Sequence, residues 1–144
     1  MAKKDYKLNR FPDSFKCVFE LWFDIICEYT KIEKEDAIQY YNERANVGAF
    51  CAALARNNIT YLEEYVCEKG WGDNKGNGRT DLSFYFRGQW YVVEAKICKG
   101  KGTWLSKFKS SIDAACDDVH RTWQKQRYSA SIGMSFVVPE ITNK

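Results

Sequence analysis

The sequence predicts an α/β (α+β) protein in which helices flank a central mixed β-sheet. The strongest observation is the segment 79–96, where two runs rich in aromatic and β-branched residues are separated by Arg87-Gly88-Gln89, a pattern typical of a β-hairpin. Segments 15–29 and 105–128 carry apolar residues at three- and four-residue steps, which predicts amphipathic helices. A further strand is expected at 132–138, stopped by Pro139.

Between these segments, alanines favour a helix over 40–57, with Asn57-Asn58 as its stop signal. Residues 59–67 favour a strand, and the glycine-rich stretch 70–78 is expected to be a loop. The expected order is therefore an extra N-terminal helix followed by an αβββαβ core. By length this is a single domain over 1–144, with a helical extension at 1–39 and the core at 40–138.

Composition argues against several classes of protein. The six cysteines are scattered and there is one histidine, so we expect buried, reduced thiols instead of a disulfide framework or a structural zinc site. No apolar run is long enough to cross a membrane, and no hydrophobic signal core follows the N-terminus, so a cytoplasmic protein without membrane contact is expected.

The hairpin carries an unusual set of charges. Glu94 and Lys96 alternate with apolar residues on one strand, so they share a face, roughly 6–7 Å apart. Asp81 is expected near them on the neighbouring strand. Two carboxylates that converge on one face of a sheet are costly unless a cation binds there. The pattern therefore predicts a divalent cation site, with a surface ion pair as the simpler alternative.

Basic residues indicate a second feature. The net charge is only +3, but lysines cluster at the N-terminus and again after the hairpin, where Lys99 and Lys101 lie. Such a cluster can steer a polyanion, although a charge run can equally be a solvated face.

These residues carry a resemblance to a known family. Arg79-Thr80-Asp81, twelve intervening residues and then Glu94-Ala95-Lys96 resemble the PD-(D/E)XK nuclease superfamily, which has the restriction-endonuclease-like fold. Thr80 stands where the family name has proline. The resemblance covers 40–138 and includes the expected order of elements.

The resemblance implies a site and a reaction. It implies that Asp81, Glu94 and the backbone carbonyl of Ala95 hold Mg²⁺ or Mn²⁺, with Lys96 beside the scissile phosphate. A helical glutamate completes the family's site. Glu43 best fits this position, while Glu64 and Glu68 remain alternatives. Oxygen ligands of this kind suit hard cations, and such ions activate water for phosphodiester hydrolysis.

A further match lies on the last expected helix. Gln124 and Tyr128 fit the Gln-x-x-x-Tyr signature of exonuclease-like members, although an exposed polar pair on a helix has the same spacing. We expect Gln124, Tyr128, Lys99 and Lys101 to contact nucleic acid.

The sequence thus predicts a Mg²⁺-dependent deoxyribonuclease, and we expect its DNA partner to be double-stranded instead of single-stranded. The sequence leaves open whether the protein forms a homodimer or needs a partner protein for targeting. The first alternative is a nuclease-fold module that binds nucleic acid or protein without cleavage. A second alternative is an interaction protein, suggested by the aromatic content.

Overall fold

The structure, a computed structural model, describes residues 13–34, 36–70, 75–100, 104–123 and 130–139. It contains three α-helices and four β-strands within these ranges. The helices are α1 (Lys16–Ile32), α2 (Glu43–Arg56) and α3 (Trp104–Trp123), and 3₁₀ turns cover Asp13–Phe15 and Ile38–Tyr40. The strands are β1 (Thr60–Lys69), β2 (Gly76–Phe86), β3 (Gln89–Gly100) and β4 (Ala130–Pro139).

The four strands form one mixed sheet in the order β1-β2-β3-β4. β1 pairs antiparallel with β2, and β2 pairs antiparallel with β3. β4 is parallel to β3, which requires a crossover connection, and α3 provides it. The expected class, helices around a mixed sheet, is confirmed, and the described elements follow one another in the expected order.

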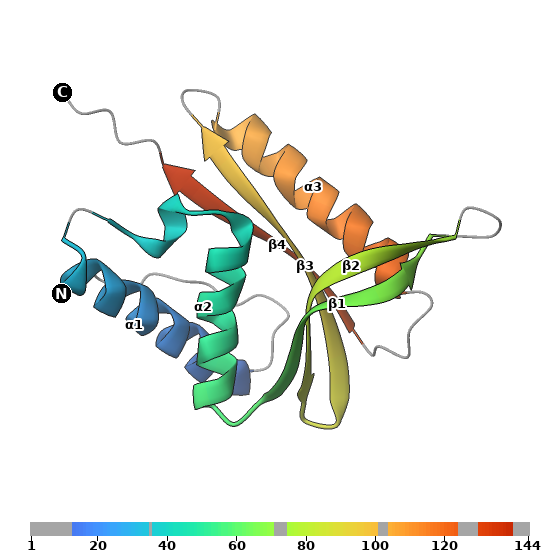
Figure 1. The fold of residues 1–144 in the computed structure, drawn as a ribbon, viewed down its shortest axis with the longest axis horizontal. Helices are drawn as coiled ribbons and strands as arrows, with labels where there is room; N and C mark the ends of the chain where they lie inside the picture. Colours follow the sequence, from blue (N-terminus) through green and yellow to red (C-terminus); the bar gives the residue numbers. More distant parts are fainter. Residues whose placement is uncertain (1–12, 35, 71–74, 101–103, 124–129, 140–144) are drawn as a thin grey trace.

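The helices cover the sheet from both sides (Figure 1). α1 and α2 pack together on one side, while α3 packs along β3 and β4 on the other. Side chains of β3 alternate between these layers: Val93 and Ala95 belong to the apolar core under α1 and α2, whereas Glu94 bonds to α3. Glu94 and Lys96 of β3 therefore lie on the side of the sheet that faces α3.

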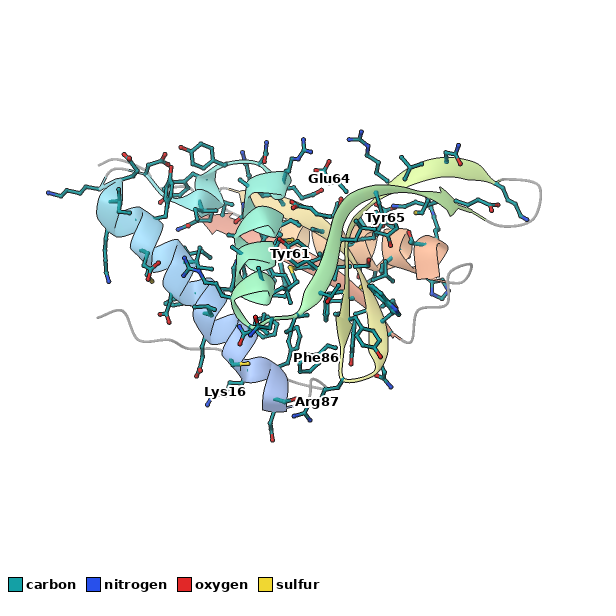
Figure 2. All side chains as sticks on the ribbon, turned by 60° about the horizontal axis from the view of Figure 1, so that its bottom comes forward. Lys16, Tyr61, Glu64, Tyr65, Phe86 and Arg87 are labelled. Atoms are coloured by element: carbon teal, nitrogen blue, oxygen red, sulfur yellow. The ribbon has the colours of Figure 1, made fainter. Side chains whose placement is uncertain are left out.

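Aromatic rings dominate the core between α1, α2 and the sheet. Phe15 stacks on Phe84 with ring centroids 5.3 Å apart and contacts Phe86 edge-on at 5.1 Å. In Figure 2, Phe86 and Arg87 lie near Lys16, so the turn between β2 and β3 is beside the start of α1. These rings fix the closed end of the hairpin against α1.

The hairpin prediction is confirmed, and its turn has a clear local cause. Arg87 and Gly88 connect β2 to β3 with φ of 49° and 82°, the left-handed conformation that two-residue hairpin turns require. The expectation of a loop over 70–78 is wrong at its end. Residues 76–78 belong to β2 and pair with Lys69, Glu68 and Cys67, while 71–74 lie outside the described residues.

The cysteine prediction is partly wrong. All six cysteines are free, as expected, but only Cys51, Cys67 and Cys98 are buried, whereas Cys17 and Cys116 are exposed. None of the described helices is long and apolar enough to cross a membrane.

Gly133 of β4 allows α3 to approach the sheet closely. A Cβ at Gly133 would lie 2.9 Å from the Cys116 backbone nitrogen, so Gly133→Ala forces the helix away from the sheet. Overpacking of this kind costs about 1–3 kcal/mol, and we expect that loss in the free energy of unfolding measured by urea denaturation. Gly76→Ala is the matched control, because a Cβ there meets nothing within 4 Å. Equal stability of the two variants would contradict this packing.

Candidate active site

The site begins where β2 and β3 separate. Their pairing runs from Phe86–Gln89 to Leu82–Val93, and the described residues show no pair beyond that point. β3 continues to Gly100 beside β4. Because alternate residues of a strand point their backbone groups to the same neighbour, Ala95 and Ile97 turn their N–H groups toward the side that β2 has left. We call this region the strand opening.

Two predicted acids satisfy these N–H groups. The N–H of Ala95 donates to Asp81 Oδ2 at 2.7 Å, and the N–H of Ile97 bonds to the Glu43 carboxylate. The sequence predicts Asp81 near Glu94 and Lys96 on the neighbouring strand, and Asp81 of β2 does bond to the backbone of Ala95, the residue between them. A buried or half-buried N–H without a partner costs about 1–3 kcal/mol, so this arrangement has a structural reason.

Glu43 is the first residue of α2. The helix begins there because the Asn42 side chain accepts a hydrogen bond from Ala45 N–H at 2.9 Å. Burial raises the pKa of the Glu43 carboxyl above its ordinary value, and the nearby charge of Asp81 adds to this. Lys96 acts in the opposite direction, so the structure brings Glu43 together with Asp81 and Lys96.

The two alternative acids are engaged elsewhere. Glu64 lies on β1 near the start of α2 (Figure 2), and its carboxylate pairs with Arg44 at 2.7 Å and Arg79 at 3.4 Å. Glu68 forms an exposed pair with Lys75 at 3.8 Å. Of the three candidates, Glu43 has the place beside Asp81.

Glu94 is nearly inaccessible, with 2% of its surface exposed. Lys69 Nζ lies 2.6 Å from Glu94 Oε1, and the Thr122 hydroxyl lies 3.1 Å from the same oxygen. Burial raises the pKa of Glu94, and the bond from Lys69 opposes that rise. The ammonium group of Lys69 therefore partly offsets the cost of a buried carboxylate.

Lys96 is held by α3. Its Nζ lies 2.8 Å from Asp118 Oδ2, and both side chains are about one-third exposed. Burial lowers the pKa of Lys96, but the bond to Asp118 and the charges of Glu43 and Asp81 outweigh it, so the net pKa is raised. The ion pair that we had considered for Lys96 thus exists, but with Asp118 instead of Asp81 or Glu94.

Sequence reasoning missed Lys69, Asp118 and Thr122. A buried acid predicts some basic or hydroxyl partner, which is the available signal. The sequence does not show which lysine reaches Glu94. Lys69 does so because its stem lies against Gly78, where a Cβ would be 2.7 Å from Lys69 Cδ.

The oxygen atoms near the strand opening are of the kind that a hard divalent cation prefers, but they are not arranged as a coordination shell. Asp81, Glu94 and Glu43 offer carboxylate oxygens, and Ala95 turns its carbonyl to the same side as its N–H. Within the described ranges, no group of three His, Cys, Asp or Glu side chains is arranged to hold a metal ion. Lys69 instead provides the cation beside Glu94.

The predicted nucleic-acid contacts are only partly visible. Lys99 lies exposed on β3, on the same strand as Lys96. Lys101, Gln124 and Tyr128 lie outside the described residues.

Comparison with known proteins finds no matching family model, curated protein or solved structure. The resemblance to PD-(D/E)XK nucleases therefore stays a prediction from the sequence.

Lys69→Met tests the buried ion pair, because it removes the ammonium group and keeps an apolar stem. Breaking one side of such a pair costs about 3 kcal/mol, and we expect that loss at neutral pH in urea denaturation. The loss should shrink as the pH falls, because Glu94 already has a raised pKa and takes up a proton more readily without Lys69.

The control for this variant is Lys75→Met, at the residue that precedes β2. Its partner Glu68 is about half exposed, so a change within about 0.5 kcal/mol is expected. Equal losses in the two variants would show that the pair with Glu94 has no special role.

Glu43→Gln should make the metal-free protein more stable at neutral pH. When folding raises the pKa of a carboxyl, the folded protein loses stability as the pH rises through the raised value. Glutamine avoids this loss, and its side-chain oxygen can still accept a hydrogen bond from the Ile97 N–H. The gain in melting temperature, measured with a chelator, should disappear below the ordinary carboxyl pKa.

Glu64→Gln is the comparison for Glu43→Gln, because Glu64 pairs with two arginines. We expect it to leave stability unchanged or lower it. A stability gain for Glu43→Gln that persisted unchanged into acid would show that the raised pKa of Glu43 is not its cause.

Proposed function

We propose that this chain is a metal-dependent nuclease that hydrolyses phosphodiester bonds of DNA. The observation that carries the proposal is the strand opening, because Asp81, Glu43 and Lys96 act on one another there and Glu94 lies at its edge. These are the residues that the PD-(D/E)XK resemblance selects. The charges of Asp81, Glu94 and Lys96 could have been dispersed over the sheet, but they converge.

The arrangement of elements supports the same proposal. The motif strands β2 and β3 lie between the helix that carries Glu43 and the crossover helix α3. The restriction-endonuclease-like fold has this order of elements. We propose that the α2-to-β4 portion of the chain is such a core.

The excess of negative charge supports a role for Mg²⁺ or Mn²⁺. Four carboxylates, from Glu43, Asp81, Glu94 and Asp118, face two ammonium groups, those of Lys69 and Lys96. Glu43, Asp81, Glu94 and the Ala95 carbonyl would hold the ion, which when bound lowers the pKa of water and offsets charge on the phosphate.

The protein's own groups have separate roles in this proposal. Lys96, which stays charged because of Asp118, places an ammonium beside the scissile phosphate and stabilises the negative charge that develops there. Asp118 orients Lys96. The bond from Lys69 opposes the rise that burial causes in the pKa of Glu94, and a cation that binds Glu94 would replace or share this ion pair.

One observation favours the alternative of a nuclease-fold module that binds without cleavage. Both Glu94 and Lys96 are already paired, with Lys69 and Asp118, so two motif charges are neutralised within the chain. If the chain is such a module, Lys96 and the other lysines near the site would bind nucleic acid or a protein partner without taking part in cleavage.

The test of the proposed function is cleavage of duplex DNA in Mg²⁺ and in Mn²⁺. We expect cleavage by the unaltered chain and a loss of at least about 100-fold for Asp81→Asn and for Lys96→Ala. The first removes a carboxylate that would hold the ion, and the second removes the ammonium beside the reacting phosphate. Glu68→Gln is the matched control and should retain activity, because Glu68 is an exposed acid away from the strand opening.

Undiminished cleavage by Asp81→Asn would remove the nuclease proposal. DNA binding that weakens steeply with salt, without cleavage in either metal, would favour the binding module instead.

A further inference from the structure

A pocket of about 330 Å³ lies between β3 and α3, next to the strand opening. Its polar lining comes from Lys96 and Lys99 of β3 and from Lys107, Ser110 and Ser111 of α3. We call it the basic pocket. Lys96 belongs to both the basic pocket and the strand opening, so a ligand that occupies one reaches the edge of the other.

The charged side chains that line the basic pocket are lysines, and one of them, Lys96, is paired with Asp118. Among its described lining residues there is no Asp or Glu. Lys99 and Lys107 are exposed, and neither forms an ion pair with an acidic side chain in the described part of the chain. Lys107 therefore offers an exposed ammonium group to a ligand, beside Lys96 of β3.

The serines add donors of a second kind. Ser110 and Ser111 line the pocket from consecutive positions on α3, and Ser111 Oγ lies 2.8 Å from Ser135 Oγ of β4. The contact with Ser135 helps to hold the Ser111 hydroxyl in place. Ammonium and hydroxyl groups that surround one space donate hydrogen bonds to oxyanions, and phosphate oxygens are favoured ligands of such a set.

We propose that the basic pocket binds a backbone phosphate of the DNA strand that is cut, beside the phosphate that reacts. The proposal rests on the proposed nuclease function and deepens it, because it gives the substrate strand a path from the strand opening along β3 toward α3. Lys99 lies roughly 10 Å along β3 from Lys96. That length corresponds to about three nucleotide steps of 3.4 Å, so the bound phosphate lies within about three nucleotides of the cut.

The chain offers a matched pair of lysines for the test. Lys107 lines the basic pocket, whereas Lys109, two residues later on the same helix, lines a different, apolar hollow with Leu105 and Phe108. Both are exposed on α3, so either change to alanine alters net charge and helix composition equally. Only the direction of the side chain differs.

The experiment measures binding of a fluorescent DNA duplex by anisotropy at several salt concentrations, in EDTA so that no metal-dependent cleavage occurs. For Lys107→Ala we expect weaker binding and a slope of log K against log salt that is smaller by about 0.9, the value for one lost phosphate contact. Lys109→Ala should leave the slope unchanged. Ser110→Asp, which introduces a negative charge into the basic pocket, should weaken binding more than Lys107→Ala, and inorganic phosphate should compete less well against this variant.

Equal slopes for Lys107→Ala and Lys109→Ala, or full binding by Ser110→Asp, would overturn the phosphate site. If the unaltered chain still cut DNA, the nuclease proposal would stand without it. If the unaltered chain neither bound nor cut DNA at low salt, the proposed function itself would fail. Circular dichroism checks that each variant keeps its fold.

Discussion

The separation of β2 from β3 after the Leu82–Val93 pair is the constraint on which the site depends. A strand that loses its neighbour leaves backbone N–H groups that need another acceptor. On β3 these groups belong to Ala95 and Ile97, and the acceptors are the carboxylates of Asp81 and Glu43. The hydrogen-bonding requirement of the backbone thus brings two acids from different elements to one point, in a place where their charges repel.

This repulsion is offset by two lysines that reach the site from different directions. Lys69 arrives from the edge strand β1 and bonds to Glu94, while Lys96 is turned toward Asp118 on α3. The pKa of Glu43 remains raised, mainly because the carboxyl is partly buried and further because Asp81 is negatively charged. A site that keeps unfavourable charge is typical of function more than of stability. The basic pocket continues from Lys96, so positive potential begins where the acidic cluster ends.

Much of the architecture could be predicted because it depends on short-range patterns. The turn at Arg87-Gly88 requires left-handed backbone, the three- and four-residue spacing marks the helices, and a long helix between two strands indicates a parallel crossover. The prediction of a loop was wrong at 76–78 for a physical reason. The glycines there favour a loop by local propensity, but pairing with Cys67–Lys69 of β1 extends β2 through them.

The sequence by itself determined the order of the elements and the identity of the motif residues Asp81, Glu94 and Lys96, because periodicity and spacing are properties of neighbours along the chain. Only the tertiary structure decided their partners. The choice of Glu43 over Glu64, the pairing of Glu94 with Lys69 and the pairing of Lys96 with Asp118 depend on where β2 leaves β3 and how closely α3 approaches the sheet. The paired residues are far apart in the chain. The free energy of each buried charge depends on its distances to all of its partners, and only the folded structure sets these distances.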